Sequence, residues 1–181
     1  MGQDRLFTIG HSTRSLGEFL ELLEREGVRH LVDVRAFPAS RRYPHFSREN
    51  LEASLAVPGI RYTHFPELGG RRKASPDSRN TEWRNAGFRA YADYMETPQF
   101  DAALERLLHL AQAEPTAVMC AEAVPWRCHR TLISDAAEAS GVHVFHILDS
   151  TVSRHTLTKF ARVENGRVRY DAASQAELFQ S

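Results

Sequence analysis

Short apolar runs alternate along this chain with amphipathic segments, and this alternation limits the possible folds more than any other feature. The first apolar run, residues 6–9, precedes a segment in which Leu16, Phe19 and Leu23 share one helical face. A second apolar run then covers residues 28–34. The order strand, helix, strand is typical of a parallel sheet with helices packed on its faces.

The same alternation continues through the chain. A capping box of Ser15 and Glu18 is expected to start the first helix. We therefore expect an α/β fold of three layers, in which helices cover both faces of a mostly parallel sheet of about five strands. Further strands are predicted at residues 60–65, 116–120 and 142–148, and further helices begin near Ser47, Pro98 and Pro125.

The length of 181 residues and the hydrophobic content of 42% are those of a single domain, residues 1–181, with a substantial core. We expect a flexible insertion at about 69–85, whereas the tail at 150–181 carries only weak signals. The sequence shows no signal peptide and no run of the roughly 20 apolar residues that span a bilayer. These features indicate a soluble, cytoplasmic protein without a membrane partner.

The charges of the chain balance at zero but are unevenly distributed. Residues 35–91 hold eleven Lys and Arg against five Asp and Glu, whereas residues 93–149 hold three against nine. Such an asymmetry marks either a basic binding face or two solvated faces that attract each other. Both interpretations stay open.

Both cysteines fall in TAVMCAEAVPWRCHR, residues 116–130. Two cysteines do not make a disulfide framework, which favours a reducing compartment. A thiol at the end of a strand, next to cationic residues at a helix N-terminus, is how α/β proteins build reactive or anion-binding sites. Cys120 is the expected nucleophile or redox thiol, and Cys128 is expected in the first turn of the helix.

Polar residues at the strand ends should meet in one crevice, because parallel strands all end at the same edge of a sheet. Asp33 in an apolar strand should pair with Arg35 or Arg41. The residues at these ends are His11 and Ser12, Asp33 and Arg35, His64, and Cys120 with Glu122.

Known catalytic loops do not match the cysteine region. A tyrosine-phosphatase loop needs an arginine after five residues, but Trp126 stands at that position. Pro125 removes a backbone amide that a rhodanese-like loop would use. CxxC, Walker-type, GxGxxG and HExxH motifs are absent.

Six motifs cover most of the chain: TIGHSTRS, LVDVRAFPASRRYPHF, IRYTHFPELGGRR, FRAYADYM, MCAEAVPWRCHRTLI and HTLTKFARV. In this order they resemble the prokaryotic family catalogued as domain of unknown function number 488, over roughly residues 7–163. The resemblance implies a three-layer α/β fold in a soluble bacterial or archaeal protein, and it implies no particular reaction. The motif positions that carry over are His11, Ser12, Asp33, Arg35, Ser40, His64, Gly69, Gly70, Arg71, Cys120, Glu122, Cys128, His129 and Arg130.

The leading functional hypothesis is an enzyme, a thiol-dependent hydrolase or transferase. Its substrate would be an anionic, phosphate-bearing small molecule or a nucleotide. The expected catalytic residues are Cys120, His11, His129 and Glu122, and the expected substrate-binding residues are Ser12, Arg35, His64, Arg71, Cys128 and Arg130.

Two alternatives remain. A nucleic-acid-associated protein would bind through the basic region 35–91, where aromatic residues lie among the arginines. A metal-binding module would use cysteines and histidines, although no cofactor is firmly implied. Its possible ligands are Cys120, Cys128 and His129, with His11 or His64 as a fourth.

Overall fold

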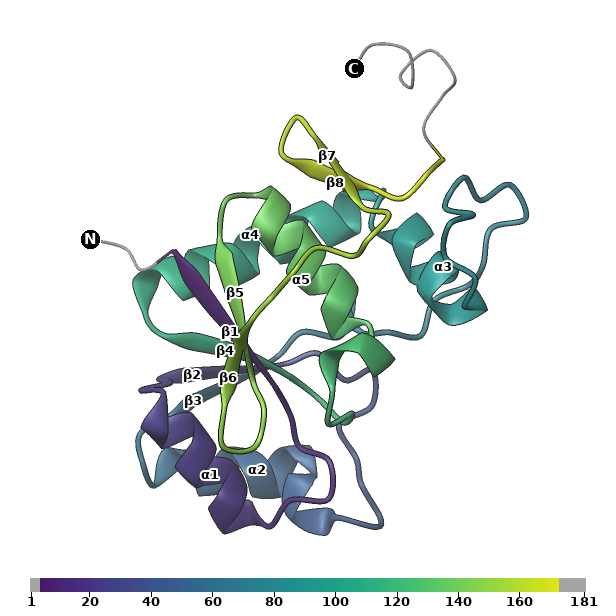
Figure 1. Cartoon of the computed structure of the whole chain (residues 1–181). Helices are drawn as coiled ribbons and strands as arrows, with labels where there is room; N and C mark the ends of the chain where they lie inside the picture. The colour runs from purple at the N-terminus through teal and green to yellow at the C-terminus, as the bar shows by residue number, and fades with distance from the viewer. Residues whose placement is uncertain (1–3, 173–181) are drawn as a thin grey trace.

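The computed structural model describes residues 4–172, and these residues form the expected α/β architecture (Figure 1). The main sheet has six strands in the order β3-β2-β4-β1-β5-β6. Strands β1 to β5 are parallel, and β6 at the edge runs antiparallel to β5. The sheet therefore has one strand more than the sequence predicts. The bounds are β1 Arg5–Gly10, β2 His30–Asp33, β3 Arg61–His64, β4 Thr116–Cys120, β5 His143–Ile147 and β6 Val152–Arg154.

Helices cover both faces of this sheet and complete the three layers. Figure 1 shows α1 and α2 on one face, and α4 and α5 on the other. Phe19 and Leu51 belong to the core on the first side, and Phe100 and Leu132 to the core on the second. The helices in the described part of the chain are α1 Leu16–Arg25, α2 Arg48–Ala56, α3 Ala86–Tyr94, α4 Pro98–Ala113 and α5 Arg130–Ala139.

The start of α1 confirms the predicted capping box. Ser15 Oγ accepts a hydrogen bond from the Glu18 amide at 3.1 Å, and the Glu18 carboxylate accepts one from the Ser15 amide at 3.2 Å. The two bonds satisfy amides that the helix itself leaves without partners. The helix then buries Phe19 and Leu23 and ends before Gly27, whose φ of 68° suits glycine.

The start of α5 differs from the prediction. The sequence suggests a helix from about Pro125, but α5 begins at Arg130, and Pro125–Arg127 forms a separate 3-10 turn. This turn is closed by a hydrogen bond from the Cys128 amide to the Pro125 carbonyl at 3.1 Å. A proline fits the first position of either helix type, so it does not tell them apart. Cys128 is extended and lies ahead of the helix rather than in its first turn.

Two segments are not part of the main sheet or its helices. Residues 69–85 contain no helix or strand, and Asp93 of α3 accepts hydrogen bonds there from Ser78 at 2.5 Å and Asn80 at 2.8 Å. The flexibility of this segment stays a prediction. Near the C-terminus, β7 (Arg162–Glu164) and β8 (Arg167–Arg169) form a hairpin. The last part of the predicted tail, residues 173–181, lies outside the described residues. Within residues 4–172 no helix is both long and apolar enough to cross a bilayer.

Candidate functional site

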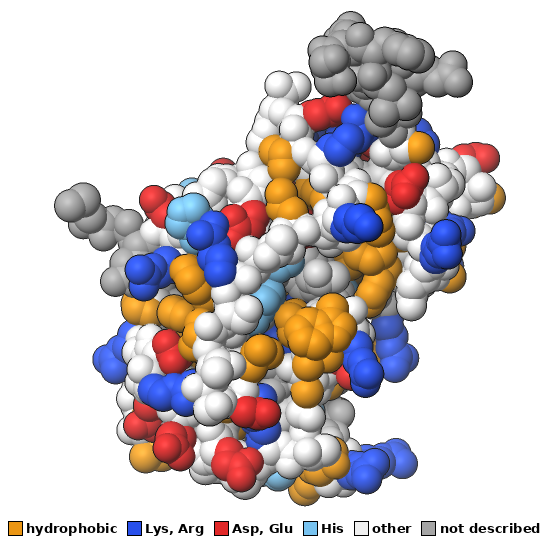
Figure 2. Space-filling model, viewed as in Figure 1, with side chains coloured by type: hydrophobic (Ala, Val, Ile, Leu, Met, Phe, Trp, Pro, Cys, Tyr) orange, Lys and Arg blue, Asp and Glu red, His pale blue; other side chains and the backbone are white. Residues whose placement is uncertain are grey.

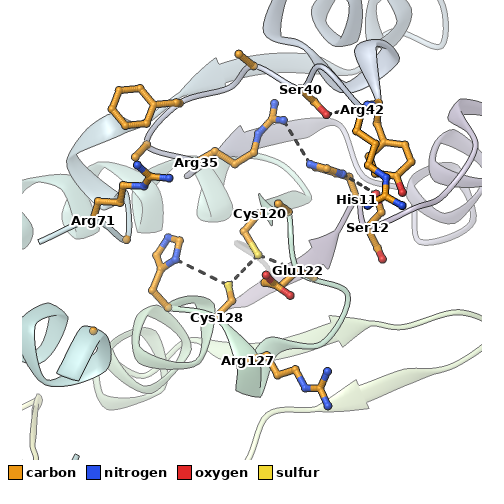
Figure 3. A pocket seen from close by; sticks show the side chains of 18 of the residues that line it. His11, Ser12, Arg35, Ser40, Arg42, Arg71, Cys120, Glu122, Arg127 and Cys128 are labelled. Atoms are coloured by element: carbon orange, nitrogen blue, oxygen red, sulfur yellow. Dashed lines mark hydrogen bonds between the residues drawn. The ribbon is translucent and has the colours of Figure 1, made fainter. Parts of the chain in front are cut away.

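The C-terminal ends of β1, β2 and β4 meet at one edge of the sheet, where a cavity of about 850 Å³ opens (Figure 3). Gly10 at the end of β1 is the register partner of Cys120 at the end of β4. The loops that follow these two strands are joined by further backbone hydrogen bonds. The His11 amide donates to the Cys120 carbonyl at 3.0 Å, and the Ser12 amide donates to the Ala121 carbonyl at 2.9 Å. The predicted site residues that line the cavity are His11, Ser12, Arg35, Arg71, Cys120, Glu122, Cys128 and His129. The other two predicted site residues, His64 and Arg130, do not line it.

Gly10 permits the close approach of these loops. A Cβ atom at Gly10 would lie 1.7 Å from the Glu122 carbonyl oxygen, far inside van der Waals contact. The glycine after the first strand therefore lets the loop that follows β4 pass directly over β1. That crossing places the Glu122 carbonyl where the Arg130 side chain reaches it at 2.7 Å.

The two cysteines lie side by side in the wall of the cavity. Both are free, and their Sγ atoms are 2.8 Å apart. Cys120 is 2% exposed and Cys128 is 5% exposed. The amide of Arg130, the first residue of α5, donates to Cys128 Sγ at 3.2 Å. The Cys128 sulfur therefore faces the start of a helix, where backbone amides favour negative charge.

Arg130 lies behind the sulfur pair and is completely buried. Its Nε donates to Cys120 Sγ at 2.9 Å, its Nη1 to Thr8 Oγ1 at 3.0 Å and its Nη2 to the Glu122 carbonyl at 2.7 Å. Its partners in the described part of the chain are neutral oxygens and sulfur, with no carboxylate among them. A buried guanidinium is costly unless a negative group lies beside it. The thiol pair is placed to supply that charge.

The two thiols have different surroundings. Burial raises the pKa of the Cys128 thiol, but hydrogen bonds with Cys120 and His129 and the charges of His129 and Arg130 outweigh this and hold it well below its usual value. Burial raises the pKa of the Cys120 thiol, and its hydrogen bond with Cys128 adds to the rise. These directions favour negative charge on Cys128 and a protonated Cys120 that donates to it.

Arg35 belongs to another wall of the cavity, and its predicted pairing with the buried Asp33 is confirmed. Arg35 donates to Asp33 from Nε at 2.9 Å and from Nη2 at 2.7 Å, and Tyr62 adds a hydroxyl at 2.5 Å. Arg35 Nη1 faces His11 Nε2 at 3.4 Å. Burial lowers the pKa of His11 to about 4, and its Nδ1 donates to the Ser12 carbonyl at 3.0 Å. The His11 ring is therefore neutral at neutral pH, and its Nε2 is the acceptor that faces Arg35 Nη1.

Backbone carbonyls fix two other histidines. His129 Nε2 donates to the Val34 carbonyl at 3.2 Å, and this bond points Nδ1 at Cys128 Sγ, 3.8 Å away. His64 Nε2 donates to the Arg35 carbonyl at 2.7 Å. His129 is thus oriented toward the thiolate, whereas His64 supports the loop that follows β2.

The exposed cations of the cavity are Arg42, Arg71 and Arg127. The Arg71 guanidinium lies 5.3 Å from the Phe37 ring centroid, and that of Arg42 lies 5.6 Å from the Tyr43 ring centroid. Within residues 4–172 neither Arg42 nor Arg71 forms an ion pair with a carboxylate. The sequence places Arg42 in the basic region but not in the cavity, because spacing alone does not show which arginine of a loop faces inward.

The sequence also predicts a metal site or a nucleic-acid site as alternatives. The part of the chain that the structure describes has no group of three His, Cys, Asp or Glu side chains placed to hold a metal ion. In the basic region, Arg72 donates to the Gly69 and Pro66 carbonyls at 3.0 Å, and its guanidinium lies 3.6 Å from the Tyr94 ring centroid. Figure 2 shows the Lys and Arg side chains of one face spread out rather than gathered in one patch.

A family model described as Domain of unknown function DUF488 matches residues 15–137, which is more than half of the chain. This match confirms the resemblance found in the sequence motifs. The matched range contains Cys120, Cys128 and Arg130, whereas His11 precedes it. A search of curated proteins and a search of solved structures each gave no match.

Proposed function

We propose the following function for this chain, which belongs to the family described as Domain of unknown function DUF488: it is a thiol-dependent hydrolase or transferase that acts on an anionic, phosphate-bearing substrate. The observation that carries the proposal is the burial of Arg130 beside two sulfur atoms and no carboxylate. A thiolate next to a buried cation, in the wall of an open cavity, is an activated nucleophile.

Cys128 is the nucleophile in this proposal, whereas the sequence alone favours Cys120. Cys128 Sγ accepts a hydrogen bond of 3.2 Å from the first backbone amide of α5 and lies 3.8 Å from His129 Nδ1. Cys120 Sγ contacts both Cys128 and the guanidinium of Arg130. Cys120 and Arg130 therefore stabilise the negative charge, and His129 Nδ1 lies beside the Cys128 sulfur as a general base.

The reaction has two steps. The Cys128 thiolate attacks an acyl carbon or a phosphorus atom of the substrate, so that a bond from sulfur forms and the bond to the leaving group breaks. The leaving group departs with the electron pair of the broken bond and takes a proton from solvent water. Water, or another acceptor in a transferase, then attacks the covalent intermediate, gives its proton to His129 Nδ1 and frees the thiolate. His129 passes this proton to solvent.

Arg42 and Arg71 supply positive charge for the anionic part of the substrate. Both side chains are exposed in the cavity, and Figure 3 shows them across it from the sulfur atoms. Arg35 is already paired with Asp33, which offsets its positive charge. Arg35 would therefore orient the substrate by hydrogen bonds rather than attract it by net charge. Glu122 keeps the role predicted from the sequence, which is to orient a cation or a protonated group.

Protection of Cys128 against alkylation tests this proposal without knowledge of the substrate. Millimolar inorganic phosphate or pyrophosphate should slow the reaction of Cys128 with iodoacetamide, and Arg71→Ala or Arg42→Ala should remove the protection. Arg48→Ala is the matched control, because Arg48 is exposed on α2 and does not line the cavity. Equal protection in all these variants would contradict anion binding in the cavity.

Turnover gives the second test. The wild-type protein should hydrolyse members of a panel of phosphate-bearing esters and thioesters, and Cys128→Ala should not. A Cys128→Ala variant that keeps wild-type turnover would contradict the nucleophile assignment.

A nucleic-acid-associated function is the second candidate, and Phe37 is the observation that favours it. The ring is 69% exposed in the cavity lining, with the Arg71 guanidinium over it. An exposed aromatic ring beside a cation suits stacking on an unpaired base. Affinity for a single-stranded oligonucleotide that falls steeply with salt, with a smaller slope in Arg71→Ala, would favour this function. No binding at low salt would exclude it.

A further inference from the structure

We propose that Asp135 is a positioning residue for the thiol pair and that it acts on Arg130 through a buried chain of hydrogen bonds. The inference rests on the proposed function in one respect, namely that one thiol of the pair is ionised. Neither Asp135 nor any residue that links it to Arg130 lines the cavity. The proposed reaction uses none of these residues directly, so any effect they have on it passes through Arg130.

The chain of hydrogen bonds lies on the face of the sheet that α5 covers. Thr8 of β1 and His146 of β5 are direct neighbours in the sheet register, His155 follows β6, and Asp135 lies in α5. All of these side chains, and Arg130, are at most 8% exposed. The links are Arg130 Nη1 to Thr8 Oγ1 at 3.0 Å, Thr8 Oγ1 to His146 Nδ1 at 2.7 Å, His146 Nε2 to His155 Nδ1 at 2.9 Å, and His155 Nε2 to Asp135 Oδ1 at 2.8 Å.

Asp135 is held at the far end of the chain by several donors. Besides His155, it accepts from the Thr158 amide at 3.0 Å, the Thr158 hydroxyl at 2.6 Å and the Tyr170 hydroxyl at 2.7 Å. The segment HTLT near the C-terminus, which the sequence motifs single out, thus supplies two of the residues that bind this carboxylate. A carboxylate in these surroundings acts only as an acceptor.

The two ends of the chain fix the hydrogen positions between them. Because Asp135 accepts, His155 carries its hydrogen on Nε2, and its Nδ1 accepts from Nε2 of His146. His146 Nδ1 then accepts from the Thr8 hydroxyl, whose oxygen accepts from Arg130. In the reverse direction the Thr8 oxygen would accept from both Arg130 and His146, and the Thr8 hydroxyl hydrogen would have no acceptor within this chain of hydrogen bonds, because a guanidinium never accepts.

A neutral His146 is needed for this direction, because its ring must accept at one nitrogen and donate at the other. Burial is the main cause that lowers the pKa of His146 to about 3, and the charge of Arg130 adds to it. The ring is therefore neutral over the physiological range. Thr8 connects this chain of hydrogen bonds to Arg130 and so to the two thiols.

The consequence for the site is a fixed direction of the Arg130 guanidinium. Thr8 holds Nη1 and the Glu122 carbonyl holds Nη2, so that Nε points at Cys120 Sγ. Without the Thr8 hydroxyl, Nη1 loses its acceptor and the guanidinium is free to tilt away from the sulfur atoms. The pKa of the Cys128 thiol should then rise, because charge-assisted hydrogen bonds depend strongly on geometry.

The test compares Thr8→Val, which removes the hydroxyl, with Thr8→Ser, which keeps it. The measured quantity is the pH midpoint of Cys128 alkylation, read by peptide mass spectrometry. Thr8→Val should raise the midpoint by about one pH unit, which is about a 10-fold slower reaction at pH values below both midpoints. Thr8→Ser should react like the wild type.

Ser134→Ala is the control for a loss of stability alone. Ser134 is completely buried and donates to the Arg130 carbonyl at 2.7 Å, but it stands outside the chain that ends on Asp135. This variant should lower the Tm and leave the alkylation midpoint unchanged. A midpoint that shifts as much in Ser134→Ala as in Thr8→Val would overturn the inference.

Failure of the inference differs from failure of the proposed function. A folded Thr8→Val variant with the wild-type midpoint overturns only the positioning role of Asp135. A wild-type midpoint near that of a free thiol, about 8.5, overturns the thiolate and with it both proposals. If Thr8→Val does not fold, ¹⁵N NMR of the wild-type histidines replaces it. Hydrogen on Nε2 of both His146 and His155 supports the inference, and hydrogen on Nδ1 of either ring overturns it.

Discussion

Replacement of Arg130 by methionine tests the link between the buried cation and the thiolate. Methionine keeps much of the side-chain volume but removes the charge and the hydrogen bonds to Cys120, Thr8 and the Glu122 carbonyl. We expect the pKa of the Cys128 thiol to rise toward the value of a free thiol. The variant should also lose about 1–3 kcal/mol of stability at every pH, because the Glu122 carbonyl loses its main partner.

The pH dependence of unfolding gives the size of the electrostatic effect. The Cys128 thiol has a lowered pKa in the folded protein, so it releases a proton on folding at pH values below its unfolded pKa of about 8.5. Its contribution to stability is complete above the unfolded pKa and is lost as the pH falls through the folded pKa. One proton corresponds to about 1.4 kcal/mol per pH unit, and the unfolded thiol is already half ionised at pH 8.5. With the folded thiol ionised throughout, its contribution to the unfolding free energy should rise by about 2.3 kcal/mol between pH 6.5 and 8.5. In Arg130→Met the rise should be less than half of this.

Urea unfolding at pH 6.5, 7.5 and 8.5 under reducing conditions measures this rise. The raised pKa of Cys120 acts in the opposite direction as the pH approaches and passes its unfolded value, and it lowers the rise by about 0.4 kcal/mol at pH 8.5. The slope that buried histidines add near pH 6.5 is common to all variants and cancels in the difference. Cys128→Ser should flatten the curve while Arg130 stays in place, so it tests the reasoning even if Arg130→Met does not fold. A flat wild-type curve, or equal slopes in all three proteins, would refute the reasoning.

Two further predictions concern packing and acid stability. Gly10→Ala should cost more than about 2 kcal/mol, because the new Cβ would lie 1.7 Å from the Glu122 carbonyl oxygen, whereas Gly17→Ala, with open space around it, should be neutral or stabilising in the same urea assay. Equal effects would contradict the close loop approach. Burial lowers the pKa of His11 to about 4 and, with nearby charges, that of His146 to about 3, so the unfolded chain binds more protons below pH 6.5. The unfolding free energy should fall by about 3 kcal/mol for each histidine between pH 6.5 and 4, His146→Gln should remove its share, and an unchanged fall would contradict the neutral ring.

The sequence predicts the central strands well, because each is a short apolar run bounded by glycine, proline or charged residues. It does not predict β6 (Val152–Arg154), in which only Val152 is apolar and which gains its hydrogen bonds from β5. The predicted start of α5 is five residues too early, because Pro125 fits a 3-10 turn as well as an α-helix. Tertiary contacts determine both strand β6 and the start of α5, and the hydrophobic periodicity of the sequence carries no information about such contacts.

The sequence predicts where the candidate site lies better than it predicts how the residues of the site contact one another. The topology of a parallel sheet correctly brings His11, Arg35 and Cys120 to one cavity. The sequence assigns Arg130 to the substrate, whereas the structure places it behind the sulfur atoms, because the helix begins at this residue. Polar residues such as His146 in an apolar strand indicate that a partner exists. They do not show that the partner is a residue 138 positions away.

The most direct test of the thiolate is the alkylation rate of Cys120 and Cys128 measured separately from pH 5 to 10 by peptide mass spectrometry. A free thiol titrates near pH 8.5. We predict that Cys128 reacts with a midpoint well below that value and that Cys120 reacts only at higher pH. Two cysteines that react together near pH 8.5, or that stay inert until the protein unfolds, would contradict a stabilised thiolate at Cys128.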